Sequence, residues 1–561
     1  MRKRHAVNRC APASLPFPRK LGIPSWDEIL AATQAEPVGP CRENRPNYPI
    51  HCKKIPIASL ESIDALALEA PTWLREQWKR VRPILTDPAM YAPFAEPEPA
   101  TLLFDHSTEQ LNEMVEKGLV ELHGGDSAVG WVRKKGVCEQ SKKRWRLIDH
   151  TTTANKAPRT IDLELNSMAH LQTAGLDGTH GIIYDFTCFF HAFAYANDVT
   201  KFFCFRGPDG SLYHLNRLAM GQTHACDLAH TVSLLIATVA AKREARTSNQ
   251  SPVSFRVHID NGLLVGSPVR ISAVFQEVQS ICNHVGILIN DDAHTPSTEV
   301  DFAGVHLDFT NKTVRVTEKV RAKATHMLQY LEHATEISNL ALASIVGLGL
   351  HFHTVVRANG YPGACPFWKA LRHYRGISRQ CTTKALWLST GTLAPGVRKD
   401  IVAWLHQVAY SNAVPILDMS APIDFGIAID ASANEYGALV VNLNDNKYHI
   451  IHRAFPAALK ASVDSESLAC AALMDELTQL TKGAHCAIYS DHRGLRDAFT
   501  KGFSPHPGYN RAILALKKPA AMRQITFKHI KGSDNPADEI SRGKPPNQKK
   551  IDDFISLLTN T

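Results

Sequence analysis

The stretch VHIDNGLLVGS at residues 257–267 most constrains what this chain can fold into. Apolar residues occupy every second position over 255–259, which is the spacing of a half-buried β-strand. Asn261-Gly262 is a dipeptide typical of a two-residue type I′ turn, and an apolar run returns after it. The sequence therefore predicts a β-hairpin that carries Asp260 at its bend.

An ionised carboxylate beside a packed sheet is costly unless a partner compensates its charge. One interpretation of Asp260 is an Asx-rich turn with solvated side chains. The other is a divalent cation bound at the bend, and a second carboxylate favours it. Residues 181–184 form a short apolar run that ends on Asp185. Carboxylates on adjacent strands of one sheet can hold two Mg²⁺ ions about 4 Å apart, as in-line displacement at phosphorus requires.

A second set of carboxylates lies in the C-terminal part of the chain. Apolar residues alternate over 425–429 and lead to Asp430, and the segment CAIYSDHRG repeats this strand-to-carboxylate pattern at Asp491. Asp538 lies in a segment expected to form a final helix. Any single Asp in these positions would be interpreted as a solvated loop or helix start, so their order matters more than any one of them.

Glu466 lies in a predicted helix that Asp464 or Ser465 opens as N-cap. A carboxylate on the apolar stripe of a helix is poor structural design, which favours a functional site. Helical spacing places Glu466 on one face with four apolar residues: Ala469, Cys470, Leu473 and Leu477.

The first group of motifs resembles the palm of a reverse transcriptase from an LTR-type or tyrosine-recombinase retrotransposon. The strand that ends on Asp185 resembles the first metal-binding motif of that family, and HIDN resembles its aromatic-x-Asp-Asp box. Trp145 to Asp149, with Asn155 following, is similar to the fingers motif that meets the incoming triphosphate. Three further segments, at residues 218–222, 286–290 and 300–307, are similar to the family's nucleotide-positioning turn and to the two segments that close the palm.

The resemblance implies a cofactor and a set of contact residues. Asp185 and Asp260 are expected to be catalytic and to bind two Mg²⁺ (or Mn²⁺) ions, and Phe190 to lie under the incoming sugar. The residues expected to contact nucleotide or nucleic acid are Arg144, Arg146, Phe190, Met220, Gly221, Gln222 and Asn261.

Three departures from the family pattern bear on activity. His258 replaces an aromatic residue, Asn261 replaces the second Asp of the box, and Ala293-His294 stands where a Lys is expected. Asn261 removes one negative charge beside the metal ions. These departures keep an alternative open: a degenerate or domesticated nucleic-acid-binding protein with weak or no polymerase activity.

The second group resembles ribonuclease H. The order strand, helix, strand, helix is that of the family, and NPADEISR resembles its ending in retroelements. His529, at the end of the preceding strand, is expected to be structural or to flank the substrate. The resemblance implies two metal ions, an RNA–DNA hybrid as substrate, and four catalytic, metal-binding carboxylates: Asp430, Glu466, Asp491 and Asp538.

Composition agrees with a soluble, nucleic-acid-binding protein. The chain has 561 residues, 44% of them hydrophobic and 21% charged, with a net charge of +8. Residues 131–146 are rich in Lys and Arg and bounded by Trp131 and Trp145, a composition suited to phosphate neutralisation and aromatic contact. No apolar run of membrane-span length and no secretory signal is visible, so an intracellular, cytoplasmic and/or nuclear protein is expected.

The twelve Cys form no CxxC pair, which indicates a reducing compartment without a disulfide framework or zinc knuckle. Cys41 and Cys52 have no His or Cys partners at ligand spacing and are interpreted as structural or incidental.

The sequence thus predicts a multidomain chain of α+β and α/β class: a right-hand palm, fingers and thumb followed by a ribonuclease H-like domain. Its predicted partners are RNA template, DNA primer, RNA–DNA hybrid and deoxynucleoside triphosphates. The closest resemblance is to DIRS-like elements, including VIPER-type ones, with LTR elements as the alternative. The predicted divisions are an N-terminal extension (1–95), fingers and palm (96–315), thumb and connection (316–415), ribonuclease H-like domain (416–545) and a flexible C-terminal tail (546–561).

Overall fold

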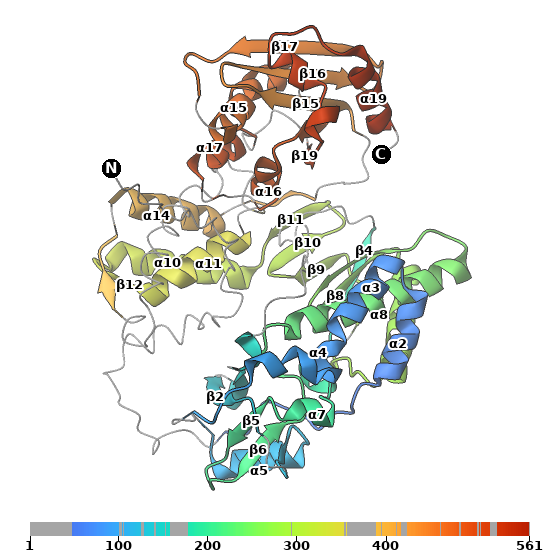
Figure 1. The fold of residues 1–561 in the computed structure, drawn as a ribbon, viewed down its shortest axis with the longest axis vertical. Coiled ribbons are helices and arrows are strands. Elements are labelled where there is room, and N and C mark those ends of the chain that lie inside the picture. The colour runs from blue at the N-terminus through green and yellow to red at the C-terminus, as the bar shows by residue number, and fades with distance from the viewer. Residues whose placement is uncertain are drawn as a thin grey trace, which may run out of the picture.

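The structure is a computed structural model that mixes helices with six sheets among its described residues. Figure 1 shows the elements that follow residue 424 gathered at one end of the long axis. Cys41 and most of the predicted connection lie outside the described residues. The structure describes residues 48–99, 104, 106–124, 128–139, 142–151, 153–156, 178–292, 294–352, 355, 389–393, 395–410, 412–416, 423–459, 462–481, 484–501, 504, 506–516 and 524–559.

The predicted hairpin belongs to a three-stranded antiparallel sheet of order β4-β8-β7. Two helices with many buried apolar residues pack against this sheet, and the second ends at Gly286, whose left-handed φ of +84° stops the helix. The elements are β4 (His180–Asp185), β7 (Ser254–His258), β8 (Asn261–Gly266), α8 (Ala225–Ser248) and α9 (Pro268–Val285).

Helix α8 is long and apolar enough to cross a membrane by length and composition. However, 78% of its apolar window is buried inside the protein, and the core helix of a soluble protein passes the same test. We therefore describe α8 as a core helix.

The turn of the hairpin lies one dipeptide earlier than the sequence predicted. His258 pairs with Asn261, so Ile259-Asp260 forms the loop and Asn261-Gly262 begins the returning strand. The Asn261-Gly262 dipeptide therefore does not form the turn. Glycine is required at position 262 for a different reason, its packing against the neighbouring strand. A Cβ at Gly262 would lie 2.1 Å from the ring of Tyr184, its partner on β4, so only glycine fits there.

The described part of the predicted N-terminal extension shares a core with this sheet. Helices α2 and α3 pack against α8, and Leu74, Trp78 and Val81 join the same buried cluster as α8 and α9. Ser59 begins α2 as an N-cap by accepting from the backbone N–H of Ser62. The elements are α2 (Leu60–Glu69), α3 (Thr72–Val81), α4 (Pro83–Thr86), η2 (Pro88–Met90) and η3 (Ala92–Phe94).

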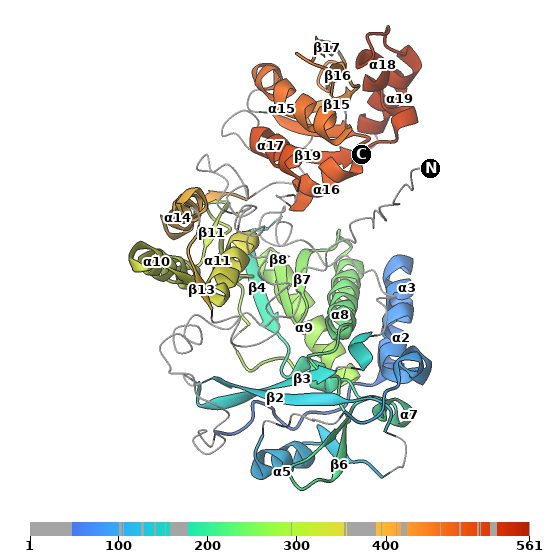
Figure 2. The same ribbon diagram turned by 60° about the vertical axis from the view of Figure 1, so that its left-hand side comes forward.

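The basic stretch forms a hairpin, β2-β3, in which Lys134 is buried and paired with Asp149 at 2.6 Å. Figure 2 shows this hairpin between the β4-β8-β7 sheet and the elements α5 and β6. A second small sheet, β1-β6-β5, lies beyond it. The elements are α5 (Thr108–Glu116), β1 (Val120–Leu122), β2 (Val132–Glu139), β3 (Arg144–Thr151), η5 (Ala154–Lys156), η6 (Phe189–Ala192), α7 (Asn197–Thr200), β5 (Cys204–Arg206) and β6 (Leu212–Leu215).

A second core forms where the sheet β14-β11-β10-β9 meets three helices. Helix α10 presents an apolar stripe to this core, because Ala324, Met327, Leu328 and Leu331 are all buried. The elements are β9 (Glu299–Phe302), β10 (Val305–Asp308), β11 (Thr313–Val316), α10 (Glu318–His333), β12 (Ile337–Ser338), α11 (Asn339–Phe352), β13 (Thr390–Gly391), α14 (Pro395–Tyr410) and β14 (Val414–Pro415).

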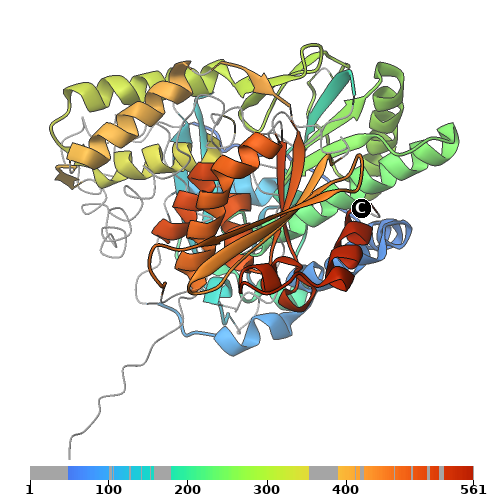
Figure 3. The same ribbon diagram turned by 90° about the horizontal axis from the view of Figure 1, so that it is seen from above.

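The C-terminal part is a five-stranded sheet of order β17-β16-β15-β18-β19, with β15 antiparallel to β16 and parallel to β18. Both faces are covered. Ile427 and Ile429 pack into one core and Ala428 into another, so β15 is buried on both sides. Figure 3 shows orange helices on one side of this sheet and red helices on the other. The strands are β15 (Phe425–Ala431), β16 (Glu435–Asn442), β17 (Tyr448–Ala454), β18 (His485–Ser490) and β19 (Gln524–His529).

Two details of this part differ from the prediction. Helix α15 begins at Ser462, so Asp464 and Ser465 lie inside its first turn and are not N-caps. The expected flexible tail instead contains α19, whose Ile551, Phe554 and Leu558 are buried on the sheet. The helical elements are α15 (Ser462–Leu480), α16 (Arg493–Lys501), α17 (Pro507–Leu516), η8 (Gly532–Asp534), α18 (Ala537–Ile540) and α19 (Gln548–Thr559).

Candidate catalytic carboxylate sites

The first candidate site lies where β4 ends beside the hairpin tip. Asp185, the last residue of β4, pairs with Asn261 across the sheet, and Asp260 precedes Asn261 in the loop. The backbone N–H of Phe186 donates to the carbonyl oxygen of Asp260 at 3.3 Å. The structure therefore brings Asp185 and Asp260 to one end of two adjacent strands, as the sequence predicted.

Burial and mutual repulsion act on these two carboxylates. Burial, together with the charges of Asp260 and Asp292, raises the pKa of Asp185 to about 6. Burial also raises the pKa of Asp260, against the opposing effects of Asn261 and Arg146. Among the described residues, none donates to the buried Oδ1 of Asp185. A buried carboxylate oxygen without a donor is costly, and a divalent cation with oxygen ligands would satisfy it, so these residues fit Mg²⁺.

Helix α8 holds the hairpin tip in an unusual conformation. Ile259 has a φ of +61°, the left-handed region that β-branched residues rarely adopt. Ser233 donates to the carbonyl oxygen of Ile259 at 2.5 Å, and Nδ1 of His230 accepts from its N–H at 3.3 Å. Sequence reasoning missed these two supporting residues. Their signal is a His and a Ser three positions apart in the mostly apolar stretch 228–241 of this helix.

Asn261 contacts the predicted metal ligand directly. Its Nδ2 donates to Oδ1 of Asp260 at 2.9 Å. At the position where the resemblance implies a second carboxylate, this chain has an amide that orients the first one and stabilises its ionised form.

The two predicted basic contacts differ in their surroundings. Arg146 is 46% exposed and pairs with Glu139 at 3.1 Å, yet it lies close enough to lower the pKa of Asp260. Arg144 is engaged by Glu139 at 2.5 Å and by His51 at 2.9 Å. Arg146 is therefore the better placed of the two for a ligand at the carboxylate pair. Phe190 lies in η6 and is 9% exposed, packed mainly into the core.

The predicted positioning turn at residues 218–222 packs against strand β3. A Cβ at Gly221 would lie 1.5 Å from the carbonyl oxygen of Asp149, and Asn155 donates to the Gly221 carbonyl at 3.0 Å. Met220 is partly exposed, whereas Gln222 is fully buried between Tyr91 and Tyr195. Gln222 thus holds the turn and does not face a ligand.

His294, which stands near the expected Lys position, does not replace a Lys at a phosphate. Its two ring nitrogens lie 2.8 Å from the carbonyl oxygen of Ile183 and 3.1 Å from that of Asn290. Both nitrogens therefore face the backbone. Ala293 lies outside the described residues.

The second candidate site brings together three of the four predicted carboxylates. One oxygen each from Asp430, Glu466 and Asp491 lie within 4.8 Å of one another. Asp430 is near the end of β15 and Asp491 directly follows β18, and these strands are parallel neighbours, so both carboxylates reach the same edge of the sheet. Glu466 comes from the buried face of α15, with Ala469, Cys470, Leu473 and Leu477 buried beside it.

The closing motif NPADEISR positions this cluster. Asn535 donates to the carbonyl oxygen of Ile429 at 3.1 Å, and Ser541 donates to Oδ2 of Asp430. Asp538 lies outside the group of three but close enough to raise the pKa of Asp430, and Arg542 donates to it at 2.7 Å. His529, the last residue of β19, pairs with Ser490, next to Asp491, and its role stays a prediction.

Burial dominates the electrostatics of the second site as well. It raises the pKa of Asp430 to about 6, with a further contribution from Asp491. The pKa of Glu466 is raised well above its ordinary value by burial, then by Asp430 and Asp491. Oε2 of Glu466 is buried and has no hydrogen-bond partner in the described part of the chain. Three clustered carboxylates with an unsatisfied oxygen fit divalent cations.

These raised pKa values predict a link between pH and metal binding. Asp185 and Asp430 have pKa values near 6 in the folded state against an ordinary 3.8, so the folded protein binds more protons between those values. Without metal, the stabilising effect of these two raised pKa values on the folded state is fully present below pH 3.8. It is lost as the pH rises through 6 and the buried carboxyl groups ionise. Thermal unfolding should therefore show a Mg²⁺-induced rise in Tm that is larger at neutral pH than at pH 5, where protons compete with the cation.

The matched variant Asp430→Asn should weaken that pH dependence, because the amide neither titrates nor repels Glu466. The predicted link between pH and metal binding is contradicted if Mg²⁺ raises the Tm equally at both pH values, or if the variant responds as the wild type does.

Comparisons with known proteins yield likenesses of structure only. No family model matches the chain, and no curated protein matches its sequence. A foamy viral protease-reverse transcriptase in complex with double-stranded DNA is 13% identical, with 87% of this chain and 84% of that chain covered and a TM-score of 0.46. The same kind of protein in complex with an RNA/DNA hybrid is 13% identical, with 85% of this chain and 64% of that chain covered and a TM-score of 0.44.

These solved structures are similar to this chain over most of its length. At such low identities and TM-scores, function rests on the side chains described above. The class of element remains a prediction.

Proposed function

We propose that the chain is an RNA-directed DNA polymerase joined to a ribonuclease H, from a DIRS-like or LTR-type retroelement. The observation that carries this proposal is the presence of two separate carboxylate sites on one chain. Each lies at the ends of adjacent strands, and each holds a buried carboxylate oxygen that no described residue satisfies. Two-metal phosphoryl transfer needs this kind of site, once for synthesis and once for cleavage.

At the first site, Asp185 and Asp260 would hold two Mg²⁺ or Mn²⁺ ions. Such ions activate a primer 3′-hydroxyl and stabilise the leaving pyrophosphate. Asn261 orients Asp260, while α8 fixes the loop that carries it. Arg146, exposed beside the pair, is suited to the triphosphate of an incoming deoxynucleotide.

At the second site, Asp430, Glu466, Asp491 and Asp538 would hold two ions that activate water and stabilise a leaving 3′ oxygen. Ser541 fixes Asp430 and Arg542 fixes Asp538, so the motif that follows η8 orients two of the four ligands. The substrate would be the RNA strand of a hybrid, which its 2′-hydroxyls distinguish from DNA.

The proposed partners are an RNA template, a DNA primer, the RNA–DNA hybrid and deoxynucleoside triphosphates, inside the cell. The basic β2-β3 hairpin beside the first site would contact the phosphate backbone. Nucleic acids are also the partners of the similar foamy viral proteins, one with double-stranded DNA and one with an RNA/DNA hybrid. The direct test is primer extension on an RNA template with Mg²⁺, together with cleavage of a labelled hybrid. Absence of both activities in the full chain would contradict the proposal.

Sugar selection provides a separate prediction. Phe190 follows Asp185 by one short turn and is almost buried, so its ring would limit space for a 2′-hydroxyl. Phe190→Ala should lower the preference for deoxynucleotides over ribonucleotides at least about tenfold, which a single-nucleotide incorporation assay measures.

Phe189→Ala is the matched control, because Phe189 is also buried in the same turn. Both variants should lose stability through the cavity they create. If both leave sugar preference unchanged, Phe190 is only a core residue.

A further inference from the structure

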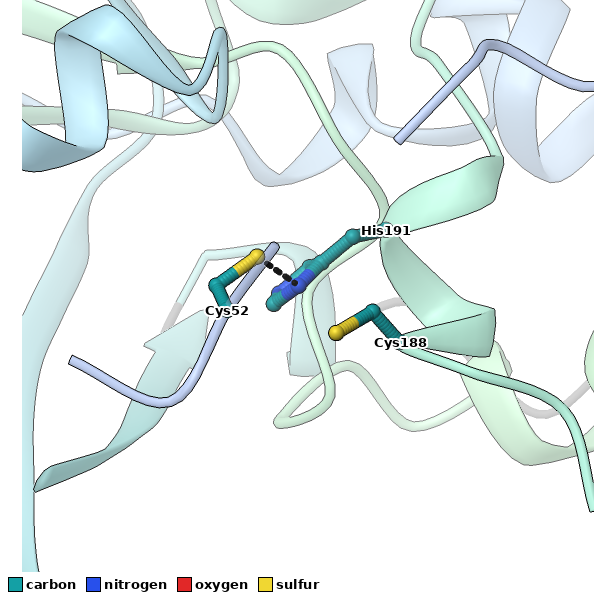
Figure 4. A group of neighbouring side chains, drawn as sticks. All are labelled: Cys52, Cys188 and His191. Atoms are coloured by element: carbon teal, nitrogen blue, oxygen red, sulfur yellow. Dashed lines mark hydrogen bonds between the residues drawn. The ribbon is translucent and has the colours of Figure 1, made fainter. Parts of the chain in front are cut away.

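Three metal-ligating side chains, two thiols and one imidazole, converge on the turn that follows β4. Figure 4 shows Cys52, Cys188 and His191 pointing toward one another from two segments of the chain. Their ligand atoms all lie within 4.8 Å of one another, and Sγ of Cys52 lies 3.3 Å from Nδ1 of His191. Cys52 is 6% exposed and His191 8%, so the group is largely shielded from water.

Sequence spacing did not bring this group together, because Cys52 and His191 are 139 positions apart. Cys52 was interpreted as structural or incidental for lack of a partner at ligand spacing. The fold supplies the partners, since the segment before α2 runs beside β3 and the η6 turn. His51 donates its N–H to the carbonyl oxygen of Trp145 at 2.6 Å, which fixes the backbone next to Cys52.

We propose that Cys52, Cys188 and His191 bind one thiophilic divalent cation, and that this cation is Zn²⁺. Two thiolates and an imidazole are a ligand set that suits zinc and not Mg²⁺, which prefers oxygen. Zinc bonds of about 2.3 Å to sulfur and about 2.0 Å to nitrogen place tetrahedral ligand atoms less than about 4 Å apart. The separations observed here are compatible with that geometry. Three protein ligands leave a fourth position for water.

The backbone already presents the ligands before any metal arrives. Cys188 has a φ of +49°, an unusual left-handed conformation for a residue that is not glycine. The N–H of His191 donates to the Cys188 carbonyl at 2.9 Å, and Arg217 donates to the carbonyl of His191 at 3.0 Å. The turn that carries two of the ligands is thus fixed on both sides. A preorganised ligand set binds a metal ion at lower cost in conformational entropy.

The location of the three ligands indicates the structural role of a bound cation. Cys188 lies between Asp185 and Phe190, so the metal would connect the end of β4 to the segment before α2. It would hold the turn that relates the catalytic carboxylate to the ring beneath the sugar. This role rests on the proposed function, whereas metal binding itself does not.

The experiment measures metal in the full-length chain without any assay of activity. Protein purified without chelator and dialysed against excess Mg²⁺ is analysed by inductively coupled plasma mass spectrometry. We expect one zinc per chain in the wild type, and at least about a tenfold lower content in Cys52→Ala and Cys188→Ala. Cys204→Ala, which removes another buried free cysteine, should retain the zinc, as should Asp260→Asn and Asp430→Asn.

Cobalt provides a readout that does not depend on a variant folding. Co²⁺ added to metal-free wild-type protein should give a thiolate-to-cobalt charge-transfer band and the intense visible bands of a tetrahedral site. Absence of both bands, together with no bound zinc, would overturn the proposal. A disulfide between Cys52 and Cys188 in non-reducing peptide mass spectrometry of freshly purified protein would also overturn it, in favour of a redox pair.

Discussion

Asp260→Asn is expected to abolish RNA-templated primer extension, with a loss of at least about 10³-fold in rate. The amide keeps the size of the side chain and its place in the hairpin loop, but it cannot neutralise a pair of divalent cations. Asp185 would then be left as the single carboxylate at the ends of these strands. Extension with Mg²⁺ at saturating deoxynucleotides measures the effect.

Asp209→Asn is a suitable control, because Asp209 also lies in a hairpin loop but is exposed and accepts from the backbone of Ser211. It should extend primers as the wild type does. Extension that survives Asp260→Asn would contradict the assignment of the site.

Asn261→Asp separates an active polymerase from a degenerate one. The change replaces a donor to Asp260 with a like charge, which costs stability without metal but adds a ligand when Mg²⁺ is present. We expect extension equal to or above that of the wild type. An inactive wild type that regains synthesis with Asn261→Asp would favour the alternative of a domesticated, non-catalytic protein.

Asp491→Asn is expected to abolish hybrid cleavage by at least about 10³-fold while leaving primer extension intact. Asp491 contributes one of three carboxylate oxygens within 4.8 Å, so its loss removes charge from the centre of the cluster. The full chain is offered labelled RNA–DNA hybrid, duplex RNA and duplex DNA. Cleavage should be confined to the RNA strand of the hybrid.

Asp445→Asn, in the exposed turn between β16 and β17, is the matched control and should cleave normally. Equal cutting of all three substrates would rule out a ribonuclease H. So would hybrid cleavage that is indifferent to both Asp430→Asn and Asp491→Asn.

The parts of the structure that the sequence predicted well are those set by local pattern. A short apolar run located β4 and a period of two located β15, with Asp185 and Asp430 at or near the strand ends. Helical spacing placed Glu466 on the buried face of α15. These predictions held because burial and periodicity act over a few neighbouring residues.

The parts that failed depend on contacts distant in sequence. The hairpin loop moved to Ile259-Asp260 because α8 provides a donor and an acceptor for Ile259, while Tyr184 requires glycine at 262. No short window contains those partners. The same holds for Cys52, whose neighbours come from the turn after β4.

The prediction of a flexible C-terminal tail was wrong for a different reason. The segment begins with the basic, Pro-containing stretch KPPNQKK, but Ile551, Phe554 and Leu558 follow it at helical spacing. A Cβ on Gly426 would lie 2.1 Å from Leu558, so β15 and α19 are in close contact. The apolar periodicity of this segment, and not its basic composition, therefore determines that it forms a helix.

The conformation of Ile259 sets stability against activity at one position of the chain. A β-branched residue in the left-handed region costs about 1–3 kcal/mol, which the folded protein tolerates because α8 fixes the loop. Selection for thermostability alone would favour glycine at this position, but the loop would then hold the Asp260 carboxylate less rigidly. Retention of Ile259 would then be a sign that a lineage still needs its carboxylate held in place, and its replacement an early mark of relaxed selection.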